Sequence, residues 1–347
     1  DHRDLHSFPT RRSSDLEVIY DGEGLTVYAD AMGIAPDGII HAVYREGRVA
    51  YHAWRSSAGV WSSETMVAEE AGPVGGIAFD ADGGLHAVHS GYKTDTLLFD
   101  NLRPFYSYKG AGDSSFTTTQ IGYPGGWTDV NYGRKSSIVV DSAGKAHMVF
   151  GREANILVFT LAKLYYASAE ADGGTVNDAV KIAEDVTDNV DNSLCIDTDG
   201  TLHVAYLGYS SSTEMFRYLS SGDGGTTWSS STAIDTTLYS GNGPDLRTDS
   251  AGGLHAGYLV ASDGTTISEV KYAYRETSSS AWETEEIDTE GWGEVSLALD
   301  DDSPVLLYAR DTGEGDAAAG YLDLVLAYRS GASSWDTQTV RDTTIPE

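Results

Sequence analysis

Short stretches in which apolar and polar residues alternate recur along most of the chain. Because side chains of a β-strand point alternately to its two faces, a period of two predicts strands with one buried face. Asp199-Gly200 and the octet SGDGGTTW at 221–228 supply turn signals between such stretches. One group of four alternating runs comprises Ser193–Asp197, Thr201–Leu207, Met215–Leu219 and a run ending near Ile234.

The hairpin core of this four-stranded unit returns at regular intervals. Its pattern is D-x-x-G-x-h-H-h-h-Y, where h is apolar, as in DTDGTLHVAY at 197–206. Steps between successive copies are 45, 61, 56, 52 and 51 residues, which suits four-stranded propeller blades of roughly 40–50 residues with longer loops in some copies. We therefore predict an all-β chain, a β-propeller in which six blades are visible. The aligned positions are His41, His86, His147, His203, His255 and, in the shortest copy, Leu306.

Four tryptophans and the repeated histidines have structural explanations in this scheme. Trp61, Trp228, Trp282 and Trp335 each open the fourth strand of a blade. The histidines occupy one blade position, so the ring places them in separate seams, and a common metal centre is excluded. We expect each imidazole to be neutral and hydrogen-bonded to the neighbouring blade.

The octet at 221–228 also fits S-x-D-x-G-x-T-W, which resembles the Asp-box (BNR) repeat of sialidase-like β-propellers. The matching residues are Ser221, Asp223, Gly225, Thr227 and Trp228. The resemblance implies that the Ser and Asp side chains bond the backbone of their own turn while the Trp plugs the space beneath. It also implies a ligand site on the opposite face, which carries the second-to-third-strand loops and the blade-to-blade links.

The first sixteen residues, DHRDLHSFPTRRSSDL, share nothing with the repeat and match the translation of a common short-read sequencing adapter. We expect this segment to be an artefact and the β-propeller domain to span 17–347. Glu17–Tyr20 then resembles the outer strand of a further blade. A six-bladed ring and a ring with a truncated seventh blade both fit the spacing.

Composition excludes several classes of partner. The chain carries 53 acidic against 22 basic residues, a formal net charge of −31, so nucleic acid and anionic membranes are poor partners. No apolar run approaches the ~18 residues of a membrane helix. Cys195, the single cysteine, sits on an inner strand and is expected to be a buried hydrophobe.

Aromatic and arginine side chains on the expected ligand face are the candidate binding residues. Aromatic planes beside polar groups suit the stacking of sugar rings. Three arginines, each near the end of a second strand, resemble the carboxylate clamp of sialidases. Alternatively, each pairs with the acid that follows it: Glu46, Glu153 or Asp311. The candidates are Tyr123, Trp127, Tyr132, Tyr209, Tyr239, Trp292, Arg45, Arg152 and Arg310.

Two acidic stretches, 185–192 and 310–317, bring several side-chain oxygen atoms together, as a calcium site requires. Neither stretch has the ligand spacing of an EF-hand loop. We therefore expect no cofactor and keep calcium as a minor alternative. No catalytic residue or cofactor motif is identified.

The leading hypothesis is a non-catalytic extracellular or bacterial-surface propeller, a monomer or part of a larger chain, that binds glycan or protein. One alternative is a carbohydrate-active enzyme, a sialidase-like glycoside hydrolase or a polysaccharide lyase. Another is a structural repeat module.

Overall fold

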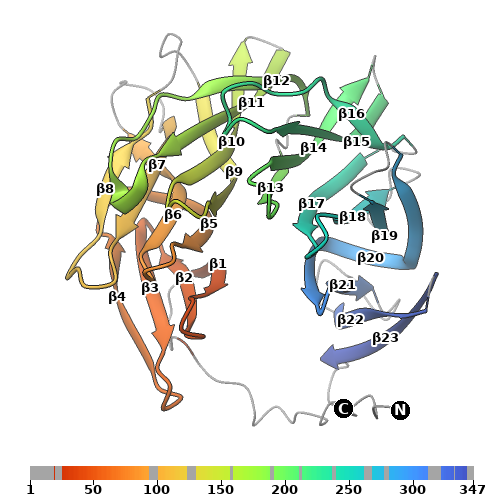
Figure 1. The fold of residues 1–347 in the computed structure, drawn as a ribbon, viewed down its shortest axis with the longest axis horizontal. Helices are drawn as coiled ribbons and strands as arrows, with labels where there is room; N and C mark the ends of the chain where they lie inside the picture. The colour runs from red at the N-terminus through yellow and green to blue at the C-terminus, as the bar shows by residue number, and fades with distance from the viewer. Residues whose placement is uncertain are drawn as a thin grey trace.

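The computed structural model describes a chain built of β-strands, with one short 3₁₀ helix at Ala171–Gly173. Successive antiparallel sheets stand around a common axis (Figure 1). The adapter-like segment and the predicted strand Glu17–Tyr20, apart from Ile19, lie outside the described residues. Those residues are 19, 26–93, 101–122, 130–156, 159–187, 191–210, 213–236, 240–261, 268–276, 281–311, 322–331 and 333–341.

Each blade takes its strands consecutively from the chain, from the axis outward. Blade 1 comprises β1 (Val27–Ile34), β2 (Ile40–Glu46), β3 (Val49–Arg55) and β4 (Trp61–Val67). Blade 2 comprises β5 (Ala71–Phe79), β6 (Leu85–Lys93), β7 (Asn101–Lys109) and β8 (Thr117–Gln120). Blade 3 comprises β9 (Val130–Val140), β10 (Ala146–Ile156), β11 (Phe159–Ala169) and β12 (Val180–Val186).

The second half of the ring follows the same order. Blade 4 comprises β13 (Asn192–Ile196), β14 (Leu202–Ser210), β15 (Thr213–Ser221) and β16 (Thr232–Asp235). Blade 5 comprises β17 (Ser240–Thr248), β18 (Leu254–Ala261), β19 (Ser268–Arg275) and the first half of β20 (Glu283–Asp300). Blade 6 comprises the second half of β20, then β21 (Ser303–Asp311), β22 (Leu322–Gly331) and β23 (Ser334–Arg341).

Strand pairing confirms the predicted β-propeller with six four-stranded blades. The 18-residue strand β20 pairs with β19 up to Gly291 and with β21 from Gly291 onward, so it is both the outer strand of blade 5 and the inner strand of blade 6. A single pair, Val186–Gly208, joins blades 3 and 4. Within the described segments, no helix is long and apolar enough to cross a membrane.

The first turn of blades 2 to 5 explains the Asp and Gly of the repeat. In blade 4, the Asp197 carboxylate accepts hydrogen bonds from the backbone N–H groups of Asp199 (3.0 Å) and Thr201 (2.8 Å). Gly200 has φ = 82°, a left-handed conformation that residues with a Cβ rarely adopt. Equivalent Asp bonds recur at Asp80, Asp141 and Asp249.

The same Asp holds the repeated histidine, and a tyrosine on the third strand holds it from the other side. In four blades Nε2 of the imidazole lies 3.1–3.2 Å from the Asp carboxylate, and Nδ1 lies 2.6–2.7 Å from the Tyr hydroxyl. The partners belong to the histidine's own blade, so the expected bond to the neighbouring blade is wrong. The sets are Asp80–His86–Tyr106, Asp141–His147–Tyr166, Asp197–His203–Tyr218 and Asp249–His255–Tyr272.

The terminal blades replace this set in different ways. In blade 1, His52 takes the tyrosine position and lies 2.8 Å from His41, with its other nitrogen 3.0 Å from Glu64. In blade 6 the turn between β20 and β21 is shorter, because Asp300 already pairs with Ser303. The histidine position is therefore held by Val305, and the alignment with Leu306 was one residue out of register.

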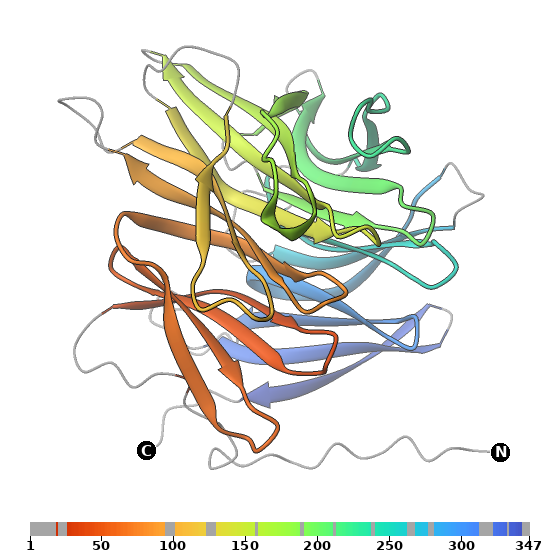
Figure 2. The ribbon, with the colours of Figure 1, turned by 60° about the vertical axis from the view of Figure 1, so that its left-hand side comes forward.

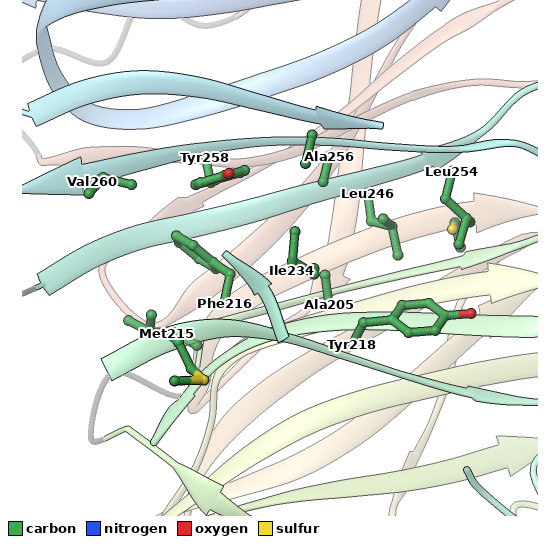
Figure 3. Packing of buried hydrophobic residues seen from close by; sticks show 13 residues of the cluster. Ala205, Met215, Phe216, Tyr218, Ile234, Leu246, Leu254, Ala256, Tyr258 and Val260 are labelled. Carbon is green, nitrogen blue, oxygen red and sulfur yellow. The ribbon is translucent and has the colours of Figure 1, made fainter. Parts of the chain in front are cut away.

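Apolar clusters fill five seams between consecutive blades. Figure 2 shows the first blades stacked face to face, and Figure 3 shows the seam between blades 4 and 5. There Phe216 of β15 meets Tyr258 of β18 with ring centroids 4.5 Å apart. Aromatic pairs also cross three of the seams with centroids 5.1–5.6 Å apart: Tyr166–Trp228, Tyr218–Trp282 and Tyr272–Trp335.

The buried histidines predict loss of stability in mild acid. Burial lowers the pKa of His86, His147, His203 and His255, although each Asp partner opposes the shift. Between the unfolded pKa of ~6.5 and the lower folded values, the unfolded chain binds more protons, so stability falls as pH drops. We expect the free energy of unfolding in urea to decrease from pH 7 to pH 5. His203→Gln should lessen that dependence, and a flat profile would contradict the assignment.

Candidate functional site

The loop face, defined as the face bearing the turns after the second strands and the blade-to-blade links, is where the inner strands begin. Side chains at these strand starts approach the axis from several blades. Lys135 of β9 lies in blade 3, Asp191 directly precedes β13 of blade 4, and Glu294 lies in blade 6. Charged groups from separate blades can therefore meet at the centre of this face.

Lys135 connects three blades. Its Nζ lies 3.3 Å from Oδ1 of Asp191 and also forms an ion pair with Glu294. The second oxygen of Asp191 accepts a hydrogen bond from the backbone N–H of Gly243 in β17, at 2.9 Å. We call Lys135, Asp191, Gly243 and Glu294 the axial cluster.

Burial differs sharply within the axial cluster. The Asp191 side chain is 3% exposed, whereas those of Lys135 and Glu294 are 38% and 70% exposed. Burial alone would lower the pKa of Lys135, but Asp191 and Glu294 outweigh that effect and the pKa is raised. The ammonium is therefore firmly protonated near neutral pH, and its two carboxylate partners leave the cluster with a net negative charge.

Backbone geometry leaves room beside these groups. Gly243 and Gly293 both have positive φ, and a Cβ added at either would meet no atom of the described residues within 4 Å. Gly293 lies in a β-bulge, since the register of β20 against β21 shifts between Trp292 and Val295. Open space thus adjoins the axial cluster on two sides.

A second carboxylate lies deeper along the axis. Asp245 of β17 accepts a hydrogen bond from the Leu297 N–H at 2.8 Å and pairs with Arg247 at 2.6 Å. Burial raises its pKa despite the neighbouring Arg247. Asp245 therefore ties blade 5 to blade 6 below the axial cluster.

The three predicted arginines do not form a shared clamp. Arg45 is 8% exposed and binds Asp30 with two nitrogens, so its predicted ligand contact is replaced by an internal ion pair. Arg310 lies 3.4 Å from Asp323 and 3.9 Å from Asp288. Arg152 lies 3.4 Å from the Tyr165 hydroxyl. For Arg45 and Arg310 these acids differ from the following residues, Glu46 and Asp311, that the sequence suggested.

Two of the predicted aromatic residues have described side chains. Trp292 is half-buried beside the bulge, two residues before Glu294 of the axial cluster. Tyr209 lies near the end of β14, and its hydroxyl donates to Glu214 at 3.3 Å. The Tyr132 backbone lies in β9, but its side chain is outside the described residues, as are Tyr123, Trp127 and Tyr239.

The acidic stretches considered for calcium are engaged elsewhere or lie outside the described part. Asp185 pairs with Arg217 at 2.8 Å and accepts a hydrogen bond from Tyr206 at 2.9 Å. Asp191 belongs to the axial cluster. Among the residues that the structure describes, no group of three or more His, Cys, Asp or Glu side chains is arranged to hold a metal ion.

The octet at 221–228 lies on the opposite face and bonds to itself. Oδ1 of Asp223 accepts from the Thr227 N–H at 2.8 Å, and the Ser221 hydroxyl accepts from the Gly225 N–H at 2.9 Å. Hydrogen bonds donated by the Thr227 hydroxyl, the Thr227 N–H and the Ser221 hydroxyl lower the pKa of Asp223 to about 2. Nε1 of Trp228 donates to the Gly225 carbonyl at 3.2 Å while its ring packs on Tyr166 across the seam.

Trp228→Ala should therefore destabilise the fold without affecting any ligand on the loop face. Losing a half-buried ring that closes a seam should cost about 3 kcal/mol of unfolding free energy, measured by urea denaturation. Ligand affinity per folded molecule should stay unchanged. A variant of normal stability that lost binding would show that the octet belongs to the site.

Reasoning from the sequence missed the axial cluster. The cluster residues occupy one position of the repeat. Lys135, Asp191 and Gly243 each lie four residues before the inner-strand residue that pairs with the repeated histidine. Aligning the inner strands as well as the hairpins would have placed them at one level. Glu294 follows the same rule, since it lies four residues before Ala298, which pairs with Val305 at the histidine position of blade 6.

Comparisons with known proteins find relatives by structure alone. No protein-family model matches the sequence. No curated protein matches it. A PL25 ulvan lyase bound to -[GlcA(1-4)Rha3S]- matches with a TM-score of 0.54 and 11% identity, covering 88% of this chain and 90% of the lyase.

Two further solved structures with a similar fold are a lectin and a sialidase. A complex of the Aleuria aurantia lectin with Fucalpha1-6GlcNAc gives a TM-score of 0.52 at 9% identity, covering 92% of this chain and 97% of the lectin. Trypanosoma rangeli sialidase gives 0.51 at 11% identity, covering 84% of this chain and 51% of the sialidase. The common property is the fold. At these identities the likeness extends to the propeller architecture, and activity has to be argued from the site.

Replacing Lys135 tests whether the axial cluster holds the blades together. Lys135→Met would leave the buried Asp191 carboxylate without its cation, and we expect a loss of about 2 kcal/mol because Lys135 is partly exposed. Lys181→Met is the matched control. Its pair with Glu184 is exposed at both ends and should contribute less than about 0.5 kcal/mol. Equal losses in urea denaturation would contradict the proposed role of Lys135.

Proposed function

We propose that this protein is a non-catalytic, glycan-binding β-propeller whose site lies at the centre of the loop face, over the axial cluster. The observation that carries the proposal is the meeting of Lys135, Asp191 and Glu294 from three blades at the axis, with Trp292 two residues before Glu294 and open space at Gly243 and Gly293. A sugar needs such a combination of an apolar ring surface and groups that donate to and accept from hydroxyls.

Trp292 suits the role of stacking platform. It is half-buried, and within the described residues it takes part in none of the aromatic pairs that close the seams. The adjacent Gly293 leaves its surroundings open. Trp335, by contrast, packs on Tyr272 and donates to Glu285 at 2.8 Å, so its ring is used internally.

Charge favours a neutral glycan. The ammonium of Lys135 is flanked by two carboxylates, and Arg45 and Arg310 are paired with acids of their own. The chain carries a formal charge of −31, which repels anionic ligands at low salt. A neutral sugar can accept from the ammonium and donate to Glu294 without adding negative charge.

Trp292→Ala should weaken binding of a neutral oligosaccharide identified on a glycan array by at least about tenfold, equivalent to ~1.4 kcal/mol, while leaving the melting temperature unchanged. Trp335→Ala is the matched control and should lower the melting temperature while preserving the affinity of the folded fraction. Calorimetric titration gives both affinities. Binding that survives Trp292→Ala would remove this residue from the site, and Trp127→Ala is the next variant to test.

One observation favours an enzyme as the second candidate. Asp245 is a buried carboxyl with a raised pKa at the axis, which is a property of general acids. Cleavage of a polysaccharide or a sialoside reporter that Asp245→Asn abolishes would support a hydrolase or lyase. Absence of both binding and cleavage would leave the structural repeat module.

The proposal places the protein outside the cell or on its surface, where glycans are met, as a monomer or as part of a larger chain. Glycan-bound structures among the proteins of similar fold support this choice of ligand. A protein ligand on the same face is the alternative, and a pull-down that Trp292→Ala abolishes, with no glycan signal, would favour it.

A further inference from the structure

Among the described residues, the seam between blade 6 and blade 1 differs from the other five. Five apolar clusters each join two consecutive blades, and none of them joins blade 6 to blade 1. No strand pairing joins these two blades within the described segments either. Figure 1 shows them as the two ends of the run of blades.

The inner strands provide a direct comparison of how well each blade is covered by the one before it. In every blade, one apolar inner-strand residue pairs with the residue that follows the histidine position. In blade 2 that residue is Ile77, which is half-buried. In blades 3 to 6 it is Ile138, Leu194, Leu246 or Leu297, and it is at most 8% exposed. Its counterpart in blade 1 is Met32, which is 73% exposed.

A second residue of β1 shows the same difference in exposure. Ile34, two residues after Met32, is 68% exposed, whereas its counterparts in the other blades are half-buried. Exposing two large apolar side chains side by side is unfavourable in water, at roughly 25 cal/mol for each Å² of apolar surface. The back of blade 1 therefore carries the residues of a covered face without the cover.

The forward face of blade 6 has the complementary property. Where blades 2 to 5 bury a His and a Tyr against the next blade, blade 6 presents Val305 and Leu326, both half-buried, with Leu307 and Leu324 beside them. These apolar residues need no hydrogen-bond partners and require only a surface to pack against. Both faces thus have the composition of a blade seam.

We infer that a further four-stranded blade of the same repeat, contributed by chain preceding β1, occupies this seam and makes the ring seven-bladed. The occupant is a blade because each exposed position is one that a blade covers elsewhere in the ring. Such a blade would also bring a seventh inner strand to the loop face beside Asp30 and Arg45.

The test compares Met32→Lys with Leu246→Lys, its buried counterpart in blade 5. In the present chain, Met32→Lys should leave the melting temperature unchanged, whereas Leu246→Lys should abolish cooperative unfolding. Sedimentation should show a monomer. An equal loss in the two variants would mean that blade 6 covers Met32 in a closed six-bladed ring. A dimer that Met32→Lys dissociates would mean that a second copy covers the seam. Either result overturns the inference.

The decisive comparison uses an extended chain, encoded by the gene together with whatever coding sequence lies upstream of β1. The extended chain should melt at a higher temperature, and Met32→Lys should now lower that temperature. Upstream sequence without a four-stranded repeat unit, or an extended chain in which Met32→Lys remains silent, would also overturn the inference.

Discussion

The whole architecture depends on the need of each blade to cover two apolar faces. A four-stranded sheet cannot bury both sides alone, so its neighbours complete its core. The seams meet this need with clusters such as that around Phe216 and Tyr258. Because successive sheets pack at an angle around one axis, their inner strands begin close together, and this brings the residues of the axial cluster into contact.

The Asp–His–Tyr set shows how polar residues can serve the same constraint. A buried imidazole is costly unless both nitrogens have partners, and here one partner comes from the first turn and the other from the third strand. The set therefore fixes the register of three strands within a blade. Its loss in blade 6, where Val305 and Leu326 take the places, is accompanied by a purely apolar face.

Much of this fold could be predicted from the sequence because the repeat is local. The D-x-x-G turn and the alternation after it specify a hairpin without reference to the rest of the chain. The partner of each histidine could not be predicted, since Tyr218 lies 15 residues from His203 and only strand pairing brings them together. The shorter turn before Ser303 likewise shifted the alignment of blade 6 by one residue.

The candidate site was harder to predict, for a physical reason. Lys135 and Glu294 are 159 residues apart and meet across the axis, so their contact becomes visible only when the inner strands of separate blades are aligned. The arginines were identified as residues at equivalent blade positions, but Asp30 and Asp323 neutralise Arg45 and Arg310 from other strands. Trp292 lies where β20 passes from blade 5 to blade 6, and its role in binding stays a prediction; the bulge beside it became evident only from the pairing of β20 and β21.

The continuous strand β20 has a mechanical consequence. Because Gly291 pairs with β19 on one side and β21 on the other, no flexible connection separates blades 5 and 6. Pulling either blade away would load backbone hydrogen bonds of the other, so these two blades should open together as one cooperative unit. The same junction lies beside Glu294, which Lys135 of blade 3 reaches across the axis, so opening of blades 5 and 6 would also break that ion pair.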